Sequence, residues 1–448
     1  MNMNLENEKV LNMSIPTTDK PTKVRWEVFI AILVLCTINY VDRAVLSVLM
    51  PAIQADLQFS PEMIGLILSA FFWGYLIMQI PSGWLCDKFS PGKVIVGTGL
   101  LWGIFQIITG FITSSTLFIG VRALLGMSEA PIYPSGGKLQ SVWLTKTERG
   151  KGAALLDSGS AIGVAIGGPI CALFMAFLDG WRGALIGAGI LTIVIVLICK
   201  PLLADGPETS KRVNEAEREY LRKAFEEEDA QSLTGVHAEK LTFSQTIRKY
   251  ITSRSFWGLC LGFASYDACW YGLMTWGALY LAATHNLDIN SLGSAIFIIY
   301  AIGVVGSFVG GALTDKWRTA SESTDKIMKR VFPILGIMVG VAMYFLSLAD
   351  TIFGAVICIS VAMFGLKWSA TMFWSLPAMV ADRQYTGSVS GAMNMIGNIA
   401  GAAIPVIVGL IVGITGSYYW ALMLFVVIGI AMGLFPVMIN YSKKIGVK

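Results

Sequence analysis

Four charged side chains lie inside long apolar segments, where they can do chemistry that surface charges cannot. Asp42 and Arg43 interrupt an apolar stretch near the N-terminus, and Arg122 and Glu129 interrupt another. On an insertion scale, a charged side chain at the centre of a membrane helix costs roughly 2.5–3.5 kcal/mol. Without partners, the four together would cost about 10–14 kcal/mol on the same scale. We therefore expect them to face one another or a water-filled cavity.

The spacing of these residues predicts which way they face. Arg122 and Glu129 are seven residues apart, which places them on one face of a helix, two turns apart. Tyr40 and Arg43 share a face of the first helix because they are three residues apart. Asp42 is rotated by about 100° from Arg43. We expect Asp42 to look toward the helix of Arg122 while Arg43 looks into a cavity.

This set of residue types suits the coupled movement of an anion and a proton. A guanidinium keeps its charge and matches a carboxylate through two parallel hydrogen bonds. A buried carboxylate gains and loses a proton near neutrality, because desolvation disfavours its charged form. Our hypothesis is that Arg43 binds a substrate carboxylate and that Asp42 and Glu129 carry protons. Arg122 would alternate between pairing with an acid and helping to hold the anion.

The alternative is a static cluster of ion pairs that holds two helices together. Apolar residues can replace a buried ion pair that serves only packing, often without loss of stability. A role in binding therefore explains the buried charges better than packing does.

The elements that position these residues are predicted to be membrane helices. Hydrophobic residues make up 55% of the 448 residues and charged residues 14%, whereas soluble proteins carry about a quarter charged residues. Apolar runs of about twenty residues form helices in a bilayer, because their backbone groups must be satisfied within the segment. The twelve predicted helices cover about residues 27–50, 63–85, 93–113, 116–138, 152–178, 182–203, 256–283, 291–314, 328–348, 351–380, 387–413 and 416–441. The fold class is an all-α membrane protein.

The positive charges predict the orientation of these helices. Most of the 33 Lys and Arg residues lie in the two tails, in every second loop or at the adjoining helix ends. Apart from Arg182, the other loops have none. Because positive residues stay on the cytoplasmic side, both termini are expected to be cytoplasmic. This distribution also argues against nucleic-acid binding, although the net charge is +4.

A long polar break predicts two halves of six helices each. We expect a cytoplasmic tail at 1–25, a first half at 26–203, a cytoplasmic linker at 204–255, a second half at 256–441 and a tail at 442–448. Within the linker, residues 214–228 predict a short amphipathic helix. We interpret it as a solvated segment, with a regulatory site as the alternative.

A short motif occurs at the same place in both halves. Gly83, Asp87 and Lys88 follow the second predicted helix, and Gly311, Asp315 and Lys316 follow the eighth. Glycine permits close helix approach, and the Asp lies where it can pair with cations and helix ends across the interface between the halves. We predict that these six residues gate the molecule.

Further polar residues within the apolar segments are candidates for contacts to a polyhydroxylated substrate. Stacking or hydrogen bonding is expected of Tyr40, Tyr75, Trp276, Trp374 and Asn394.

Two buried lysines have alternative interpretations. Lys138 ends the fourth predicted helix and is expected to extend to the cytoplasmic interface. Lys367 lies mid-helix and either pairs with Asp267 or binds the second carboxylate of a dicarboxylic sugar acid. Asp157 is expected to partner Lys138 or another cation.

The sequence resembles the major facilitator superfamily along nearly its whole length and, within it, the anion:cation symporter family. The resemblance rests on residues 39–43 (NYVDR), 79–83 (QIPSG), 122–131 (RALLGMSEAP), 148–150 (ERG) and 373–376 (FWSL), and on Asn394 with Pro405. The motif after the second helix departs from the family pattern. Ser90 stands where Gly is usual, and the next basic residue is displaced to Lys93.

The resemblance implies proton-coupled import of a sugar acid (an aldonate, hexuronate or aldarate) by alternating access. It implies a monomer in a bacterial inner membrane, with lipid, protons and a small organic anion as partners and with no cofactor. Ser160 stands where galactonate transporters carry a Gln that contacts sugar hydroxyls, so the resemblance does not extend to that contact.

Other classes of function fit the sequence less well. Sodium coupling or exchange of another carboxylate remains the alternative within transport. A membrane sensor is a more remote alternative, because it would be expected to carry a sizeable signalling domain. We expect no enzyme and no metal site, since neither a nucleophile motif nor a pattern of His and Cys ligands occurs.

Overall fold

The computed structural model describes residues 20–59, 61–178, 180–231, 245, 248, 250–285, 289–320 and 323–445. Within these residues the chain consists of helices joined by loops, and it contains no strand. The predicted N-terminal tail before residue 20, part of the predicted linker and the last three residues lie outside the described part. The all-α fold class is confirmed.

The helices of the first half follow the predicted order. They are α2 (Val24–Leu57), α3 (Pro61–Lys88), α4 (Pro91–Thr109), α5 (Ser115–Glu129), α6 (Ile132–Trp143), α7 (Arg149–Phe177) and α8 (Gly180–Cys199), followed by the short η1 (Lys200–Leu202). The polar segment then forms α9 (Glu215–Gln231), as the amphipathic pattern predicts.

Among the described residues, the second half contains six long helices and two short ones. They are α11 (Arg254–His285), α12 (Ile289–Ala320), α13 (Thr324–Leu346), α14 (Ile352–Val380), η2 (Arg383–Tyr385), α15 (Thr386–Thr415), α16 (Tyr419–Leu434) and η3 (Phe435–Met438).

The fourth predicted helix is broken, which corrects the expectation of one continuous span at 116–138. It divides into α5 and α6 at Ala130 and Pro131, where proline has no backbone N–H to continue the helical ladder. Glu129 is the last residue of α5, so the break lies beside one of the buried charges.

Ten helices in the described part of the chain are long and apolar enough to cross a membrane. The broken span is not among them, because α5 has 15 residues and α6 has 12, whereas a span needs about 20. The other omitted helix is α11, whose hydropathy is lowered by Trp, Tyr and Asp residues. With the broken span counted as one and α11 included, the predicted twelve are all present.

The two halves repeat the same packing, which confirms their pseudo-symmetry. In the first half α2 packs on α7, α3 on α5 and α4 on α8. In the second half the helices of equivalent position pair in the same way: α11 on α15, α12 on α14 and α13 on α16. Across the interface α3 packs on α15, and α7 packs on α12, the equivalent pair.

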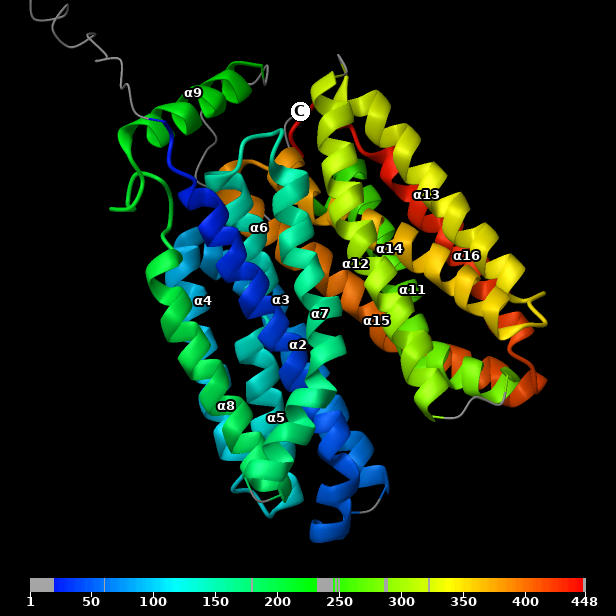
Figure 1. Ribbon diagram of the computed structural model, residues 1–448. Helices are drawn as coiled ribbons and strands as arrows, with labels where there is room; N and C mark the ends of the chain where they lie inside the picture. Colours follow the sequence, from blue (N-terminus) through cyan, green and yellow to red (C-terminus); the bar gives the residue numbers. More distant parts are fainter. Residues whose placement is uncertain are drawn as a thin grey trace, which may run out of the picture.

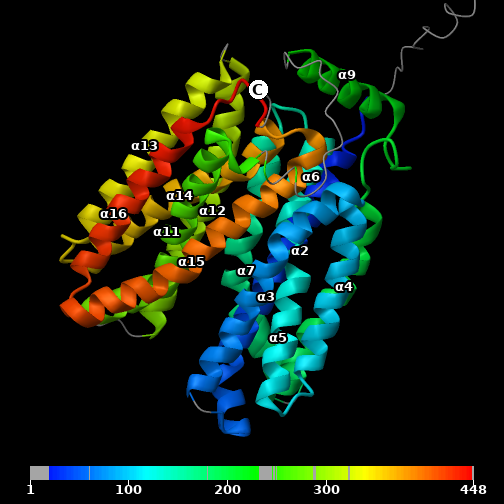
Figure 2. The same cartoon turned by 180° about the vertical axis from the view of Figure 1, so that it is seen from behind.

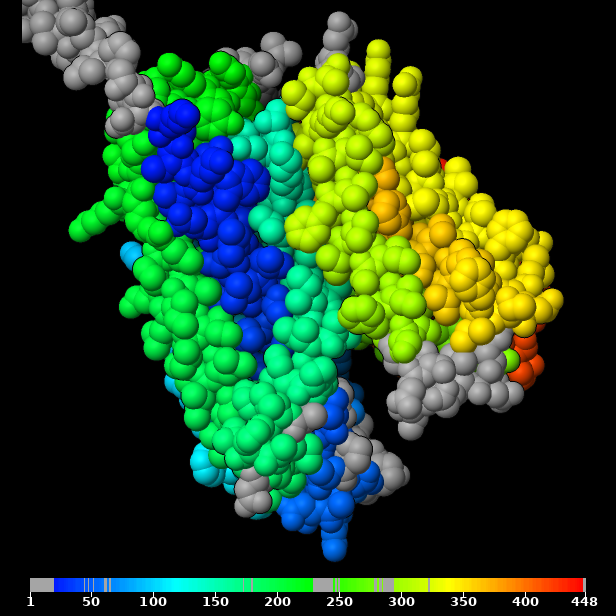
Figure 3. Space-filling model, in the orientation of Figure 1, coloured from blue at the N-terminus to red at the C-terminus, as the bar shows by residue number. Residues whose placement is uncertain are grey.

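The halves meet at one end of the molecule and separate at the other. In Figures 1 and 2 the two bundles converge at the end where α9 and the C-terminus lie, here called the α9 end. At the opposite end they splay apart, and the space-filling view in Figure 3 shows a hollow between them. Residues near the middle of the bundle thus face a space between the halves.

Candidate substrate-binding site

A cavity of about 310 Å³ lies between the halves, and we call it the arginine cavity. Its wall is formed by α2, α3, α5 and α7 of the first half and by α11 of the second. The lining residues are Tyr40, Arg43, Leu46, Leu68, Phe71, Phe72, Arg122, Val164, Tyr271 and Met274. Arg43 and Arg122 are the charged side chains among them, so an otherwise apolar and aromatic cavity carries two cations.

Arg43 is held by one carboxylate and three aromatic rings. Its Nε lies 3.1 Å from Glu129 Oε2, which also accepts a hydrogen bond of 2.8 Å from Asn39 Nδ2. The guanidinium carbon lies 4.8 Å, 4.8 Å and 4.7 Å from the ring centres of Tyr40, Phe71 and Tyr75. Such ring faces favour a cation. Only 1% of Glu129 is exposed, and its Oε1 makes no hydrogen bond within the described residues.

Arg122 differs from Arg43 in having no ion pair within the described part of the chain. It is 4% exposed, and its guanidinium carbon lies 5.1 Å from the ring centre of Phe71. Its Nε has no hydrogen-bond partner there either. Because a buried unpaired cation is costly, this geometry suits a site that takes up an anion.

Asp42 does not line the arginine cavity, although Glu129 and Arg122 on α5 act on it electrostatically. Its Oδ2 accepts hydrogen bonds from Trp102 Nε1 on α4 at 2.6 Å and from Thr192 Oγ1 on α8 at 2.8 Å. It is 2% exposed. The rotation from Arg43 turns it into the interior of the first half, where α4 and α8 pack together.

A second, narrow cavity of about 20 Å³ adjoins the first, and we call it the tyrosine cavity. Tyr40 and Tyr271 line both cavities. The lining residues are Tyr40, Tyr75, Tyr133, Asp157, Ser160, Phe263, Tyr266, Asp267, Trp270, Tyr271, Trp374, Asn394 and Asn398. Ser160, Tyr75, Trp374 and Asn394 are thus brought together around one space.

Hydrogen bonds and ring stacking fix this wall. Asn394 Nδ2 donates to Tyr75 Oη at 3.2 Å and to Gln79 Oε1 at 3.0 Å, across the interface between α15 and α3. The ring of Trp374 stacks on Tyr133 with centres 4.7 Å apart. These contacts hold polar groups of both halves at preset positions.

Lys367 pairs with Asp157. This corrects one of the two interpretations given above, in which Lys367 pairs with Asp267. Its Nζ lies 3.0 Å from Asp157 Oδ1 and 2.9 Å from Ser160 Oγ. It also lies 4.0 Å from the ring centre of Trp270, and it is fully buried. The pair joins α14 to α7, so it bridges the two halves behind the cavity wall. Asp157 is thereby the partner of Lys367 and not of Lys138.

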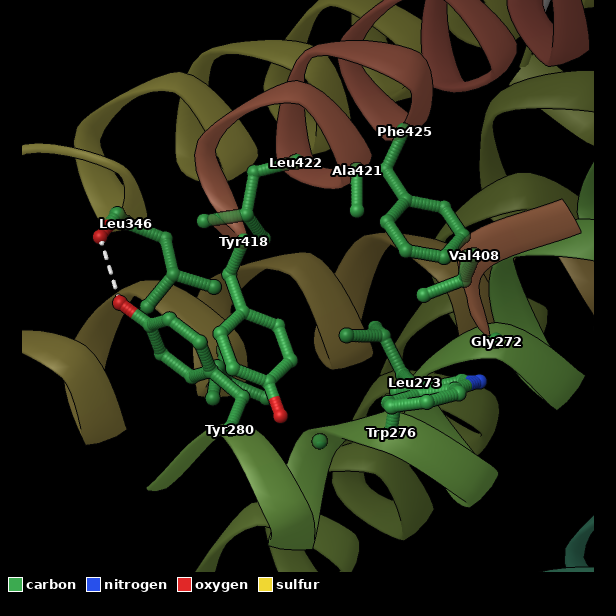
Figure 4. Close-up of a pocket in the computed structure, with 12 residues that line it drawn as sticks. Gly272, Leu273, Trp276, Tyr280, Leu346, Val408, Tyr418, Ala421, Leu422 and Phe425 are labelled. Carbon is green, nitrogen blue, oxygen red and sulfur yellow. Dashed lines mark hydrogen bonds between the residues drawn. The ribbon is translucent and has the colours of Figure 1, made fainter. Parts of the chain in front are cut away.

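Trp276 lies outside both central cavities, which corrects its place among the candidates. It lines a small apolar cavity within the second half, formed by α11, α13, α14, α15 and α16 (Figure 4). Its Nε1 donates to the backbone oxygen of Pro405 at 3.1 Å. An aromatic residue in a membrane helix has no sequence signal that separates such packing from binding.

The two repeated motifs make equivalent contacts at the α9 end. Asp87 on α3 accepts hydrogen bonds from the backbone N–H groups of Gly387 and Ser388, at 2.9 Å and 2.6 Å, in the first turn of α15. Asp315 on α12 accepts from those of Gly150 and Lys151, both at 3.0 Å, in the first turn of α7. Each carboxylate thus caps a helix of the opposite half, where the helix dipole favours negative charge.

The glycines of the motifs allow these helices to approach each other. A Cβ on Gly83 would lie 2.3 Å from the backbone oxygen of Gly387. One on Gly311 would lie 2.7 Å from the backbone oxygen of Gly150. Any larger residue at either position would push the halves apart at this end.

The lysines of the motifs are not the cations at the two capped helix ends. Lys138 and Arg318 take that place. Lys88 and Lys316 are exposed, and Lys88 lies over the ring of its neighbour Trp84. Lys138 is buried and pairs with Asp87 at 3.0 Å, which corrects its expected extension to the interface. Arg318, which sequence reasoning missed, donates to the backbone oxygen of Lys146 at 2.7 Å.

Helix α9 connects both halves rather than lying free in solvent. Its Glu217 pairs with Arg25 of the first half at 2.7 Å. Its Glu228 lies 2.8 Å from Arg149 of the first half and 3.4 Å from Arg383 of the second. Burial opposes the charge of Glu228, but Arg149, Lys444 and Arg383 outweigh it and lower the pKa of Glu228 to about 2.

Several cavity residues lacked a usable sequence signal. Tyr133, Tyr266, Trp270 and Tyr271 come from aromatic-rich helices in which most aromatic side chains serve packing. Asn398 is the exception. It lies one turn after Asn394 on α15, and this spacing is a signal by which it could have been found.

Comparisons with known proteins agree with this architecture. Residues 32–405 match the Major Facilitator Superfamily. A probable L-galactonate transporter of Escherichia coli (strain K12) is 31% identical over 391 residues, which cover 86% of this chain and 83% of that protein. A probable galactarate/D-glucarate transporter of Bacillus subtilis (strain 168) is 28% identical over 417 residues, which cover 91% of this chain and 90% of that protein.

The fold also has a counterpart among solved structures. The crystal structure of the transporter FucP in the outward conformation has a TM-score of 0.68 at 14% identity, covering 91% of this chain and 97% of that one. The family match spans most of the chain, and the helix order and packing agree with it. The chain therefore belongs to the major facilitator superfamily, as a multi-pass membrane transporter and not an enzyme.

Proposed function

We propose that the protein is a proton-coupled symporter that imports a sugar acid by alternating access. The observation that carries this proposal is the charge of the arginine cavity. Arg43 and Arg122 both line it, and Glu129 is the one carboxylate within ion-pair distance of either among the described residues. The names of the relatives, which refer to galactonate, galactarate and glucarate, support a sugar acid as the anion.

The coupling follows from competition for Arg43. An arriving carboxylate binds the unpaired guanidinium of Arg122 and then the guanidinium of Arg43. Glu129 thereby loses its cationic partner, and a proton neutralises it because a buried unpaired carboxylate is costly. The proton thus offsets the charge of the anion, so the loaded site holds the same net charge as the empty one. Asp42, which is buried behind Arg43, is proposed as a second proton carrier.

The polyhydroxylated part of the substrate would lie in the larger arginine cavity and reach the tyrosine cavity with its far end. Tyr40, Tyr75 and Trp374 offer ring faces. Asn394 offers the remaining acceptor of its amide oxygen, because its two N–H groups already bond to Tyr75 and Gln79. Ser160 is already bonded to Lys367, so its role is to orient that lysine as much as to contact a substrate.

The orientation follows from charge. The α9 end carries the Lys- and Arg-rich segments, so we place it on the cytoplasmic side of a bacterial inner membrane, with both termini there. The hollow between the halves then opens outward. Import requires the halves to rock about the central site, opening the α9 end and closing the other. We propose that a monomer does this.

The Asp87 and Asp315 contacts serve as the gate of this movement. They join α3 to α15 and α12 to α7, the two equivalent helix pairs that must separate when the α9 end opens. Gly83 and Gly311 permit the close approach, and the exposed Lys88 and Lys316 flank it.

Uptake by proteoliposomes tests the proposal. We expect an inward proton gradient to drive accumulation of an aldonate, hexuronate or aldarate. Glu129→Gln should abolish accumulation while exchange of the same acid persists, because the amide mimics the protonated acid. Uptake of no sugar acid under any gradient, or accumulation driven by sodium alone, would refute proton symport of this solute class. Unchanged proton-driven accumulation in the variant would refute the role of Glu129.

A further inference from the structure

One buried carboxylate of the central region takes no part in the contacts described so far. Asp267 on α11 lines the tyrosine cavity and is 5% exposed. Its carboxylate makes no hydrogen bond or ion pair within the described residues, and its Oδ2 is a buried acceptor without a donor there. A Cβ on Gly397 would lie 2.4 Å from that oxygen, so the carboxylate packs closely against α15. Buried acceptors almost always have a donor, so this one calls for an explanation.

The neighbouring cation does not supply that donor. Lys367 and Asp157 are the charged groups that act on Asp267 electrostatically. Lys367 directs its Nζ to Asp157 at 3.0 Å and to Ser160 at 2.9 Å. Asp157 accepts a further bond of 3.0 Å from Ser307 Oγ, which fixes the pair. One cation thus serves two acidic side chains, and no cation is left there for a further carboxylate.

The opposite pole does have a cation to spare. In the arginine cavity, Arg43 is paired with Glu129, whereas Arg122 has no ion pair among the described residues. The two cavities adjoin through Tyr40 and Tyr271. A ligand that spans them therefore meets a cationic pole at one end and an acidic pole at the other.

The acidic pole is also small. Its volume of about 20 Å³ suits one hydroxyl or one water molecule. Around Asp267 the wall offers neutral groups, which include Tyr266 and Asn398. A carboxylate placed here would meet two acidic side chains and no free cation.

We infer that Asp267 forms a subsite for hydrogen-bond donors, which selects substrates with one carboxylate and a hydroxyl or ammonium group at the far end. This inference rests on the proposed function and narrows it to monocarboxylic acids such as aldonates. It disfavours aldarates, which carry a carboxylate at both ends, although several relatives are named as galactarate/D-glucarate transporters. Asp157 and Asp267 in the tyrosine cavity are the residues that set this preference for an aldonate.

Counterflow competition in proteoliposomes that contain the full-length chain tests the subsite. The competitors are galactonate and galactarate, and gluconate and glucarate, which differ within each pair only at the terminal carbon. We expect the aldonate of each pair to inhibit exchange at a concentration at least about tenfold lower, since a donor subsite rejects a group that cannot donate. A 6-deoxy aldonate should lose most of this advantage.

The variant Asp267→Asn should reduce the preference for the aldonate to about threefold or less, because an amide donates to a carboxylate. Ser265→Ala is the matched control on the same helix, since its hydroxyl bonds to its own backbone at Leu261. It should keep the preference of the wild type. Elution of each variant as a single species from size exclusion establishes folding.

The outcomes separate the inference from the function on which it rests. Exchange of no sugar acid by the wild type would refute the proposed function. Exchange in which aldarates inhibit as well as aldonates, or a preference unchanged in Asp267→Asn, would overturn the donor subsite and leave sugar-acid transport standing. The comparison of acids on the wild type decides the substrate class even without a folded variant.

Discussion

At the scale of single residues, the buried charges fall into groups with different geometry. Arg43 is paired with Glu129, and Arg122 in the same cavity has no ion pair among the described residues. Asp42 is bonded to Trp102 and Thr192 inside the first half. An unpaired cation thus lies at a position where an anion can offset its cost.

Arg122 should therefore contribute directly to anion affinity. Hydrogen bonds to charged groups contribute about 1.5–3 kcal/mol each. Arg122→Gln should lower the affinity for a sugar acid by about ten- to a hundredfold on that scale. The affinity of Arg122→Lys should fall between those of the wild type and Arg122→Gln, because lysine keeps the positive charge and loses the paired N–H donors of the guanidinium.

Isothermal titration of purified protein measures this change. Arg182→Gln is the control, since Arg182 pairs with Asp56 at a partly exposed position far from the cavity. An affinity unchanged in Arg122→Gln would contradict the role of the unpaired guanidinium.

The two tryptophan candidates give a second residue-scale prediction. Trp374→Phe should weaken substrate binding several-fold, because Trp374 lines the tyrosine cavity. Trp276→Phe should leave affinity unchanged and lower thermal stability, because its indole N–H bonds to Pro405 within the second half. Binding and melting curves of both variants check this, and equal losses of affinity would contradict the separation of the two sites.

The sequence could locate most of these side chains and could not orient all of them. Helical spacing predicted the shared face of Tyr40 and Arg43, since both line one cavity. It did not identify the hydrogen-bond partners of Asp42, because a rotation of about 100° is compatible with several neighbours until the packing of α4 and α8 is known. Lys367 had two acids within reach, and only the crossing of α7 and α14 decides for Asp157.

At the scale of elements, equivalent helices carry equivalent contacts. The first turns of α7 and α15 are each capped by an Asp from the opposite half. The sequence predicted such contacts because the motif occurs twice with one spacing. It did not identify Lys138 and Arg318 as the cations involved, since both lie outside the motif's own lysine positions. The break between α5 and α6 was missed too, because Pro131 follows an apolar run that continues beyond it.

Loss of either cap should open the α9 end. Asp87→Asn and Asp315→Asn each remove charge-assisted bonds to two backbone N–H groups, at about 1.5–3 kcal/mol per bond. The population open at this end should rise by about tenfold or more in each variant. The rate at which a thiol reagent labels Ser390→Cys reports the opening, because Ser390 is buried at the interface beside Gly137.

The labelling assay needs a background without the native cysteines, all seven of which are free. Glu226→Gln on the exposed face of α9 is the control and should leave the rate unchanged. A rate equal to that of the parent in both Asp variants would argue that these caps do not hold the end closed.

At the scale of the whole molecule, α9 ties the two halves together through Glu228. The cations around Glu228 lower its pKa to about 2, against an ordinary value of 4.5. A carboxylate with a lowered pKa stabilises the folded contact above its ordinary pKa, and this contribution is lost as the pH falls through the lowered value. The contact should therefore be constant from about pH 5 to pH 8.

Distances between spin labels on α9 and the C-terminal segment check this expectation. Labels at Glu226→Cys and Lys443→Cys should give one distance over that pH range, whereas adding Glu228→Gln should broaden it. A distance that changes near neutrality would mean that α9 responds to the pH at which transport is measured. The pH dependence of transport is expected to arise at the central site instead.

The architecture itself was predictable because the bilayer restricts it. Apolar length, loop charge and the repeated motif together specify a helical protein of two similar halves. The sequence gives no comparable signal for how the halves meet, which depends on helix crossings. For that reason α9 was interpreted as a solvated segment, although Glu217 and Glu228 dock it to both halves.

The most direct test of the central claim is to measure protons taken up when substrate binds to purified protein in weakly buffered solution. A pH-sensitive dye should report uptake of about one proton per anion bound near neutral pH, because the anion displaces Glu129 from Arg43. Glu129→Gln should bind the anion without proton uptake. Binding by the wild type without any proton movement, or the same uptake in Glu129→Gln, would contradict the exchange of a proton for Arg43 at Glu129.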